Sequence, residues 1–145
     1  MSKFDVICSN EIDKAFVKEE RQYLTGNLKL PQVLNFIKDN NVEIGMSRYK
    51  DYKIENPHYH TEVAEYHLII KGETKYVNIT ENKEYSFSEG DFYIIRPNTI
   101  YIQKSLEGTE LIFIKVPGMN DKVSCEITQK MKEWFKEWGN SWGKI

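Results

Sequence analysis

The chain has 145 residues, a formal net charge of −2 and 40% hydrophobic residues, enough for one globular domain with its own core. It has no long basic run and no apolar run near the ~20 residues of a membrane span, so we expect neither a nucleic-acid partner nor a membrane segment. The first residues do not form a signal-peptide pattern. Cys8 and Cys125 match no paired motif. We therefore expect a cytoplasmic protein with two free thiols.

Two helical segments are predicted before residue 42. Residues 11–24 are charged and carry apolar side chains at roughly helical spacing, which predicts a short helix. A second helix is predicted to begin at Pro31, which suits a first helical position, and to end at Asn40 and Asn41. Residues 1–41 are interpreted as an N-terminal arm.

Short segments rich in β-branched and aromatic residues fill residues 42–117, and turns at Gly72, Gly90 and Gly108 separate several of them. Strands of this length and spacing predict an antiparallel sandwich or barrel. The predicted strands are 42–49, 65–71, 74–80, 84–88, 91–96, 100–104 and 110–116.

The tail, residues 118–145, returns to a helical pattern. Its apolar residues recur at helical spacing from Ile127 to Trp138, and Gly139 is a plausible stop. Such an apolar stripe on a terminal helix usually packs on its own domain, so we expect the helix to lie across the barrel. The alternatives are a dimer face or a lid.

All three histidines of the chain lie within ten residues. Alternation along a strand places His58 and His60 on one face, and Glu65 follows five residues later. Two imidazoles and one carboxylate that meet at one point suit a divalent transition metal. The alternative is that these are polar residues of the surface or core, because short histidine motifs also arise by chance.

The same stretch resembles the first motif of the cupin family, which is His-x-His, three or four residues, Glu, six residues, Gly. Here the motif positions are His58, His60, Glu65 and Gly72. Residues 90–101 are similar to the second motif, with Tyr101 where the third histidine ligand is expected. The resemblance covers residues 42–117. It implies an all-β fold, a small jelly-roll β-barrel, with the short N-terminal helical segment and the C-terminal amphipathic helix added at its ends.

The resemblance implies a metal site with His58, His60 and Glu65 as ligands and with open positions, suited to Fe, Mn, Ni or Zn. Tyr101 has three readings: a fourth ligand as phenolate, a substrate contact, which we favour, or a hydrogen-bonded tyrosine at the barrel mouth. His67 shares the strand face of Glu65, so it is a candidate general acid or base; otherwise it is a core histidine. Both Tyr101 and His67 are therefore candidate catalytic residues.

Three further side chains are candidates for substrate binding. Arg48 and Arg96 are the cationic candidates near the barrel rim, because arginine binds carboxylate or phosphate in a forked arrangement. Gln103 lies two residues beyond Tyr101, on the same face.

The function expected from these residues is a metal-dependent enzyme acting on a small polar metabolite, sugar-like or a hydroxy or keto acid. Isomerisation or epimerisation and dioxygenation are the reactions considered. The alternative is a non-catalytic binding module for a small ligand. We also expect a homodimer, because a small barrel leaves edge strands that need cover.

Overall fold

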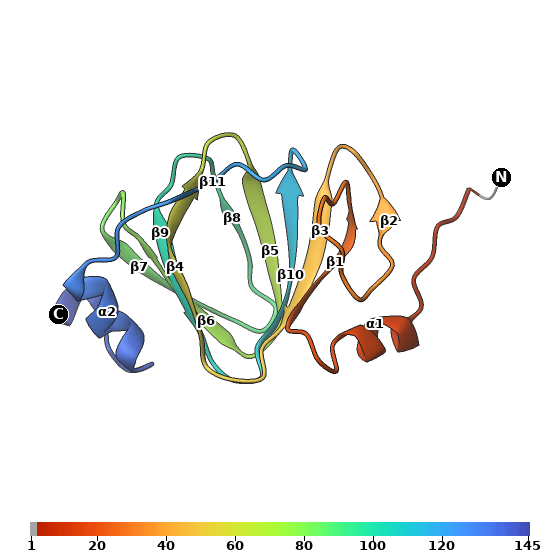
Figure 1. The fold of residues 1–145 in the computed structure, drawn as a ribbon. Coiled ribbons are helices and arrows are strands. Elements are labelled where there is room, and N and C mark those ends of the chain that lie inside the picture. Colours follow the sequence, from red (N-terminus) through yellow and green to blue (C-terminus); the bar gives the residue numbers. More distant parts are fainter. Residues whose placement is uncertain (1–2) are drawn as a thin grey trace.

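The computed structural model describes residues 3–145, which form two facing β-sheets with a helix near each end of the chain (Figure 1). The first sheet has the strand order β2 (Ile37–Lys38), β1 (Arg21–Gly26), β3 (Glu43–Arg48), β10 (Glu110–Val116), β5 (Ala64–Lys71) and β8 (Phe92–Ile95). The second has the order β11 (Lys122–Ser124), β4 (Lys53–His60), β9 (Tyr101–Ser105), β6 (Glu73–Asn78) and β7 (Lys83–Ser88).

Neighbouring strands pair in an antiparallel sense, apart from the parallel contact of β1 with β2. The chain crosses between the sheets repeatedly, as β4 and β9 in one sheet and β3, β5 and β10 in the other show. The jelly-roll barrel predicted from the sequence is therefore confirmed, with a short helix before it and another after it.

The N-terminal region differs from its prediction. The first helix, α1, spans only Ser9–Ala15, and residues 21–26 form β1 instead of continuing it. The predicted helix from Pro31 to Asn40 is wrong, because that segment is extended and includes β2. The side-chain amide of Gln32 bonds to both the backbone N–H and the carbonyl of Tyr23, at 2.9 and 2.7 Å. These bonds tie the segment to β1 in place of helical hydrogen bonds.

The sheets also extend beyond the predicted limits of 42 and 117. Strands β1 and β2 belong to the first sheet and β11 belongs to the second. Strands β2 and β11 have only two and three residues and lie at sheet edges, where alternation of a few residues gives a weak sequence signal. Strand β1 has six residues and lies inside the sheet, so the helix predicted over residues 11–24 is wrong for its last part.

The C-terminal helix α2 (Gln129–Lys136) covers the outer face of the second sheet (Figure 1). Its first turn is capped by Thr128, whose hydroxyl accepts a hydrogen bond of 3.2 Å from the N–H of Met131. The apolar contact joins Val77 and Ile102 of the sheet to a group on the tail, namely Met131, Trp134, Phe135 and Trp142. Trp142 belongs to a 3₁₀ helix, Trp142–Lys144.

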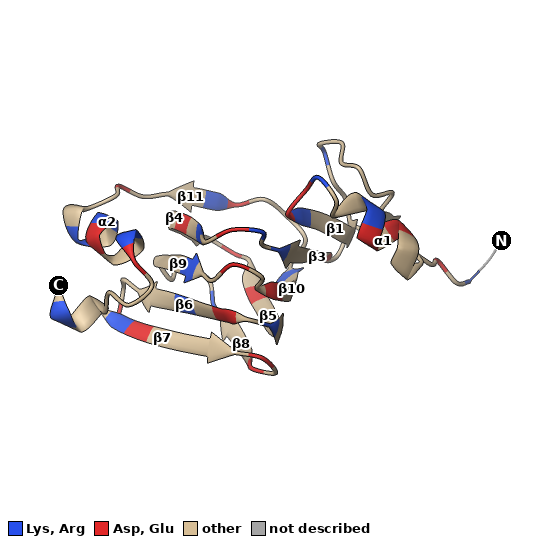
Figure 2. Cartoon of the chain, turned by 90° about the horizontal axis from the view of Figure 1, so that it is seen from below, with Lys and Arg blue, Asp and Glu red and all other residues tan. Residues whose placement is uncertain are grey.

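A second apolar cluster contains Tyr49, Ile69, Leu111 and Phe113. It lies beside polar side chains of the interior, since Phe113 of β10 pairs with His67 of β5. Charged residues of both signs are spread over the strands and helices (Figure 2). Among the described residues, no helix has the length and apolar character that crossing a membrane requires.

Candidate functional site

A cavity of about 1070 Å³ opens between the sheets, and part of its wall comes from residues 19–33. Six residues predicted from the sequence line it. They are His58, His60, Glu65, His67, Tyr101 and Gln103. The metal candidates and the candidate catalytic residues are thus brought together in one space, although they come from three different strands.

A β-bulge in β4 determines which side chains of that strand face the cavity. Glu55 pairs with Gln103 and His58 pairs with Tyr101, so two residues of β4 stand opposite the single residue between Tyr101 and Gln103. Without the bulge, residues 55 and 58 would point to opposite faces of the sheet. With it, both Glu55 and His58 line the cavity. Pro57, which has no N–H to lose, lies inside the bulge.

The two histidines of β4 are held by their outer ring nitrogens. His58 Nδ1 lies 2.9 Å from the carbonyl of Asn56, so this nitrogen carries the proton. His60 Nδ1 lies 2.7 Å from Oδ1 of Asp121, which as a carboxylate also requires a donor. Anchoring of one imidazole nitrogen by a carbonyl or carboxylate is the arrangement that metal-binding histidines commonly have. It turns both Nε2 atoms toward the cavity.

Asp121 also holds the turn between β4 and β5. Its Oδ2 accepts hydrogen bonds from the backbone N–H groups of Glu62 and Val63, at 2.6 and 2.9 Å. Burial by itself would raise the pKa of Asp121, but these N–H groups and His60 lower it to about 2. The carboxylate is therefore charged at neutral pH.

Tyr101 connects His58 to Glu65. Its hydroxyl donates to Oε2 of Glu65 at 2.7 Å, and the hydroxyl oxygen of Tyr101 also lies 2.9 Å from Nε2 of His58. Burial and the charge of Glu65 raise the pKa of Tyr101, so the phenol keeps its proton. Burial opposes the charge on Glu65, yet the charge of Lys115 and the hydrogen bond from Tyr101 help to hold the pKa of its carboxyl below the usual value.

The inner cluster therefore has more acceptors than donors. Burial lowers the pKa of His58, which leaves a lone pair on its Nε2. In a neutral His60 the Nε2 lone pair faces Oε2 of Glu65 at 3.6 Å. The single proton of the Tyr101 hydroxyl can satisfy only one acceptor at a time. A cation in the cluster would satisfy the remaining acceptors.

The donor set suits a divalent transition metal, but its arrangement is not that of a preassembled site. Within residues 3–145, no three His, Cys, Asp or Glu side chains are placed so that they could hold a metal ion as they stand. The phenol oxygen of Tyr101 lies between His58 and Glu65, where it competes with an ion for both. A bound metal would require the Tyr101 hydroxyl to move aside or to become a ligand.

His67 has no hydrogen bond on either ring nitrogen, although it is 93% buried within the described structure. Its ring stacks on Tyr93 with centroids 5.0 Å apart and planes 9° apart. Its Nε2 lies 4.0 Å from Oε2 of Glu65, too far for a hydrogen bond. A buried imidazole without partners at a cavity wall is a group that a bound molecule or ion would satisfy.

Of the three remaining residues predicted to bind substrate, one lines the cavity and two do not. Gln103 lines the cavity, but its amide N–H₂ donates to Thr74 at 2.9 Å and to Ser105 at 3.3 Å. Arg48 lies outside the cavity and pairs with Asp13 at 2.8 Å and Glu110 at 3.5 Å. Arg96 is exposed and is not part of the cavity wall either. The prediction that Arg48 and Arg96 lie at the substrate site is therefore not supported by their positions, because neither lines the cavity.

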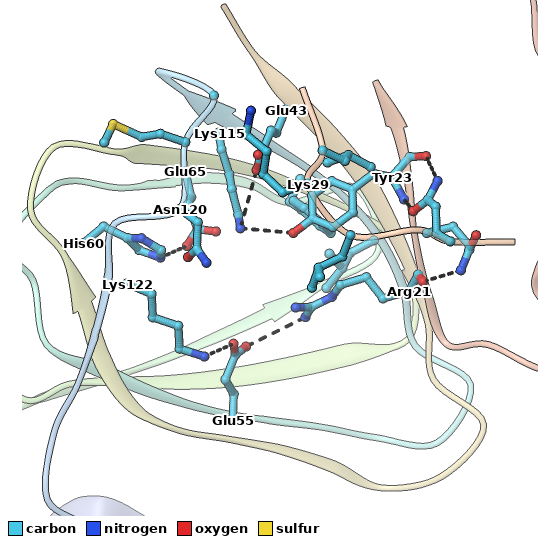
Figure 3. Close-up of a pocket in the computed structure, with 18 of the residues that line it drawn as sticks. Arg21, Tyr23, Lys29, Glu43, Glu55, His60, Glu65, Lys115, Asn120 and Lys122 are labelled. Carbon is cyan, nitrogen blue, oxygen red and sulfur yellow. Dashed lines mark hydrogen bonds and ion pairs between the residues drawn. The ribbon is translucent and has the colours of Figure 1, made fainter. Parts of the chain in front are cut away.

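Sequence reasoning missed several charged residues of the site, five of which matter for its chemistry. They are Arg21, Glu55, Lys115, Asp121 and Lys122, of which all but Asp121 line the cavity (Figure 3). None falls within a motif. Strand alternation would even place residue 55 on the face opposite to His58, and only the bulge reverses this.

No family model matches the chain, and no curated protein matches its sequence. Solved structures do match its fold. An uncharacterised protein with a double-stranded β-helix domain from Klebsiella pneumoniae is 14% identical, over 88% of this chain and 100% of that chain, with a TM-score of 0.60. KdgF from a Halomonas species is 15% identical, over 70% and 80%, with a TM-score of 0.54.

A third match is a variant of Pac13 from Streptomyces, solved with uridine. It is 12% identical, over 66% of this chain and 76% of that chain, with a TM-score of 0.54. Pac13 is described as a nucleoside dehydratase. At these identities the similarity concerns the fold. It agrees with the small jelly-roll barrel that the two sequence motifs indicated.

Proposed function

We propose that this protein, which has the small cupin fold, is a metal-dependent enzyme that moves a proton on a small polar metabolite, as an isomerase or epimerase does. The observation that carries the proposal is the excess of acceptors in the cavity. His58 Nε2 and the Glu65 carboxylate share the one phenolic proton of Tyr101, and His60 Nε2 faces the same carboxylate.

His58, His60 and Glu65 would hold the metal, with Tyr101 beside them. A divalent ion in this position would polarise a carbonyl or hydroxyl oxygen of the substrate. Asp121 keeps the proton of His60 on Nδ1, which leaves Nε2 available as a ligand.

His67 is the proposed proton-transfer group. Stacking on Tyr93 fixes the plane of its ring, and both nitrogens remain available. An imidazole suits this role because it exchanges protons near neutral pH. Proton transfer is favoured over dioxygenation because a proton acceptor without another partner lies in the cavity wall.

The size of the cavity agrees with a small polar substrate. About 1070 Å³ accommodates a molecule of one or two rings. The fold is compatible with such a ligand, since a Pac13 variant of the same fold was solved with uridine.

The first experiment measures metal. The purified protein is reconstituted with Fe(II), Mn(II), Ni(II) and Zn(II) in turn, and the bound metal is counted by mass spectrometry. We expect one ion per chain for at least one metal, and loss of that ion in His58→Ala and His60→Ala. A wild-type protein that never holds a stoichiometric ion would refute the metal-dependent function.

The second experiment distinguishes the reactions. The metal-loaded protein is incubated in deuterated water with panels of sugars, hydroxy acids and keto acids, and the products are followed by NMR. Proton-transfer chemistry places deuterium on a substrate carbon, and His67→Gln should abolish this while metal content stays. Oxygen uptake without deuterium incorporation would instead indicate a dioxygenase.

A non-catalytic binding module is the second candidate. The observation that favours it is the hydrogen bond from Tyr101 to Glu65, with His58 beside the same hydroxyl, which partly satisfies the cluster without a metal. Binding of a small ligand with neither metal uptake nor turnover would support this candidate.

A further inference from the structure

Three charged side chains lie in a row in the cavity wall, with Glu55 between two cations. One carboxylate oxygen lies 4.0 Å from Nη2 of Arg21, and the other lies 3.9 Å from Nζ of Lys122 (Figure 3). The three residues come from β1, β4 and β11, so the row joins both sheets. All three line the cavity that contains the candidate metal ligands.

These contacts are too long for hydrogen bonds, which need about 2.7–3.2 Å between nitrogen and oxygen. Within the described structure, the Glu55 carboxylate accepts no hydrogen bond, and Oε1 also lies 3.9 Å from Nε2 of His58. The side chains of Arg21 and Lys122 are 43% and 44% exposed, and that of Glu55 is 23% exposed. Loose ion pairs with this exposure contribute little to stability.

The spacing matches one bridging hydroxyl group on each side of Glu55. A hydroxyl oxygen with two hydrogen bonds of about 2.8 Å, at roughly 90–110°, holds its partners about 4.0–4.6 Å apart. A hydroxyl can donate to the carboxylate and accept from the cation at the same time. Two such hydroxyls, one between Glu55 and Arg21 and one between Glu55 and Lys122, would occupy the two oxygens of a single carboxylate.

We propose that Glu55, Arg21 and Lys122 form a binding site for a vicinal diol, and that the substrate of the cavity is a polyhydroxylated, sugar-like molecule. This inference rests on the proposed function in one respect, since it names the substrate class of the same cavity. A substrate carboxylate or phosphate would pair with the two cations but would lie against the negative charge of Glu55, whereas a diol can pair with both the cations and the carboxylate.

The local structure holds the site in place. The bulge at residues 56 and 57 turns Glu55 inward, as described above. The guanidinium of Arg21 is oriented by β3 and the residue after it. Its Nε donates to Oγ of Ser47 at 3.3 Å, and its Nη2 donates to the hydroxyl of Tyr49 at 3.4 Å. The carboxylate of Glu55 and the edge of the guanidinium are thus aimed at one region of the cavity.

The test uses methyl ribofuranoside and methyl mannopyranoside, which carry vicinal diols, and methyl deoxyribofuranoside, whose furanose ring lacks one. Binding to the full chain is measured by saturation-transfer NMR and titration, with and without metal. We expect both diols to bind and the deoxy sugar to bind at least about tenfold more weakly, because it loses hydrogen bonds to charged groups.

Glu55→Gln should weaken diol binding by about tenfold or more and leave the deoxy sugar unaffected. If Glu55→Gln folds poorly, Lys122→Met is the second variant, because the side chain of Lys122 is more exposed. It should also weaken diol binding and leave the deoxy sugar unaffected. Glu110→Gln is the matched control: its side chain is also 23% exposed and also faces two cations, Arg48 at 3.5 Å and Lys71 at 3.9 Å, but it lies outside the cavity.

The inference is overturned if neither diol binds, if the deoxy sugar binds equally well, or if Glu55→Gln and Lys122→Met both leave diol binding unchanged. Diol selectivity in a protein that takes up no metal would support the inference while the proposed function fails. Metal uptake and deuterium exchange without diol selectivity would support the proposed function and overturn the diol site.

Discussion

The hydroxyl of Tyr101 donates a buried hydrogen bond of 2.7 Å to Oε2 of Glu65. Tyr101 stands at the position where the second motif of the cupin family has a third histidine ligand. Because the raised pKa of Tyr101 keeps the phenol protonated, the hydroxyl acts as a donor to Glu65 and competes with a metal for the same oxygen.

Tyr101→Phe tests whether the Tyr101 hydroxyl is a ligand of the metal or competes with the metal for Glu65. We expect the variant to retain its metal, since the competing hydroxyl is gone. The free energy of unfolding of the metal-free protein should fall by about 1–3 kcal/mol, because a buried bond to a charged group is lost. Metal counting and urea unfolding measure the two effects. Loss of the metal in this variant would show that Tyr101 is itself a ligand.

Asp121→Asn tests whether the anchor of His60 matters for metal binding. The carboxamide can donate to His60 Nδ1 as well as accept from it, so the ring is no longer held in one tautomer. We expect metal affinity to fall by roughly 10–100-fold, the usual range for loss of such an anchor. Glu62→Gln, at an exposed neighbour, is the control and should bind metal normally.

The acid sensitivity of the metal-free protein should depend on the same residue. The pKa of Asp121 is about 2 in the folded protein and 3.8 ordinarily, so unfolding takes up a proton in this interval. Stability from Asp121 is thus present above pH 4 and lost as the pH falls toward 2, and it amounts to about 2 kcal/mol. Urea unfolding of wild type and Asp121→Asn across this range should show their difference shrinking. A constant difference would contradict the prediction.

Lys104 anchors the end of α2 to the sheet. Its buried ammonium group donates to the carbonyls of Trp134, Glu137 and Asn140 at 2.8, 2.9 and 2.8 Å. Lys104→Met leaves these carbonyls without their donor, and we expect a loss of about 2–4 kcal/mol of unfolding free energy. The control is Lys130→Met, because Lys130 lies 4.2 Å above the ring of Trp142 just as Lys104 lies 4.2 Å above that of Trp134. A similar loss in both variants would assign the effect to the aromatic contacts.

The homodimer remains a prediction. The outer face of the first sheet exposes Leu68 and Phe92, at 41% and 64%, and β8 is its edge strand. Such a face and edge would be protected in a dimer. Sedimentation should give twice the chain mass of 17.2 kDa, and Phe92→Lys should shift the equilibrium toward the monomer. A single 17.2 kDa species at micromolar concentration would contradict the prediction.

Most of the barrel strands between residues 42 and 117 could be read from the sequence because their alternation and turn glycines are local signals. The exception is β4 (Lys53–His60), which was not among the predicted strands and whose alternation is broken by a bulge. The predicted strand 110–116 coincides with β10, and 84–88 differs from β7 by one residue. The helix predicted at Pro31 failed for a nonlocal reason. Gln32 satisfies the backbone of β1, a contact that no pattern within the segment reveals.

The sequence by itself indicated the jelly-roll barrel and the grouping of His58, His60 and Glu65 through the resemblance to the two motifs, while alternation along a strand placed only His58 and His60 on one face. Only the tertiary structure decided what surrounds that group. The bulge in β4 overrides the alternation and turns Glu55 inward, and Asp121 meets His60 from a position 61 residues away. The physical reason is that these contacts depend on how separate strands are placed in space, which spacing within one strand does not encode.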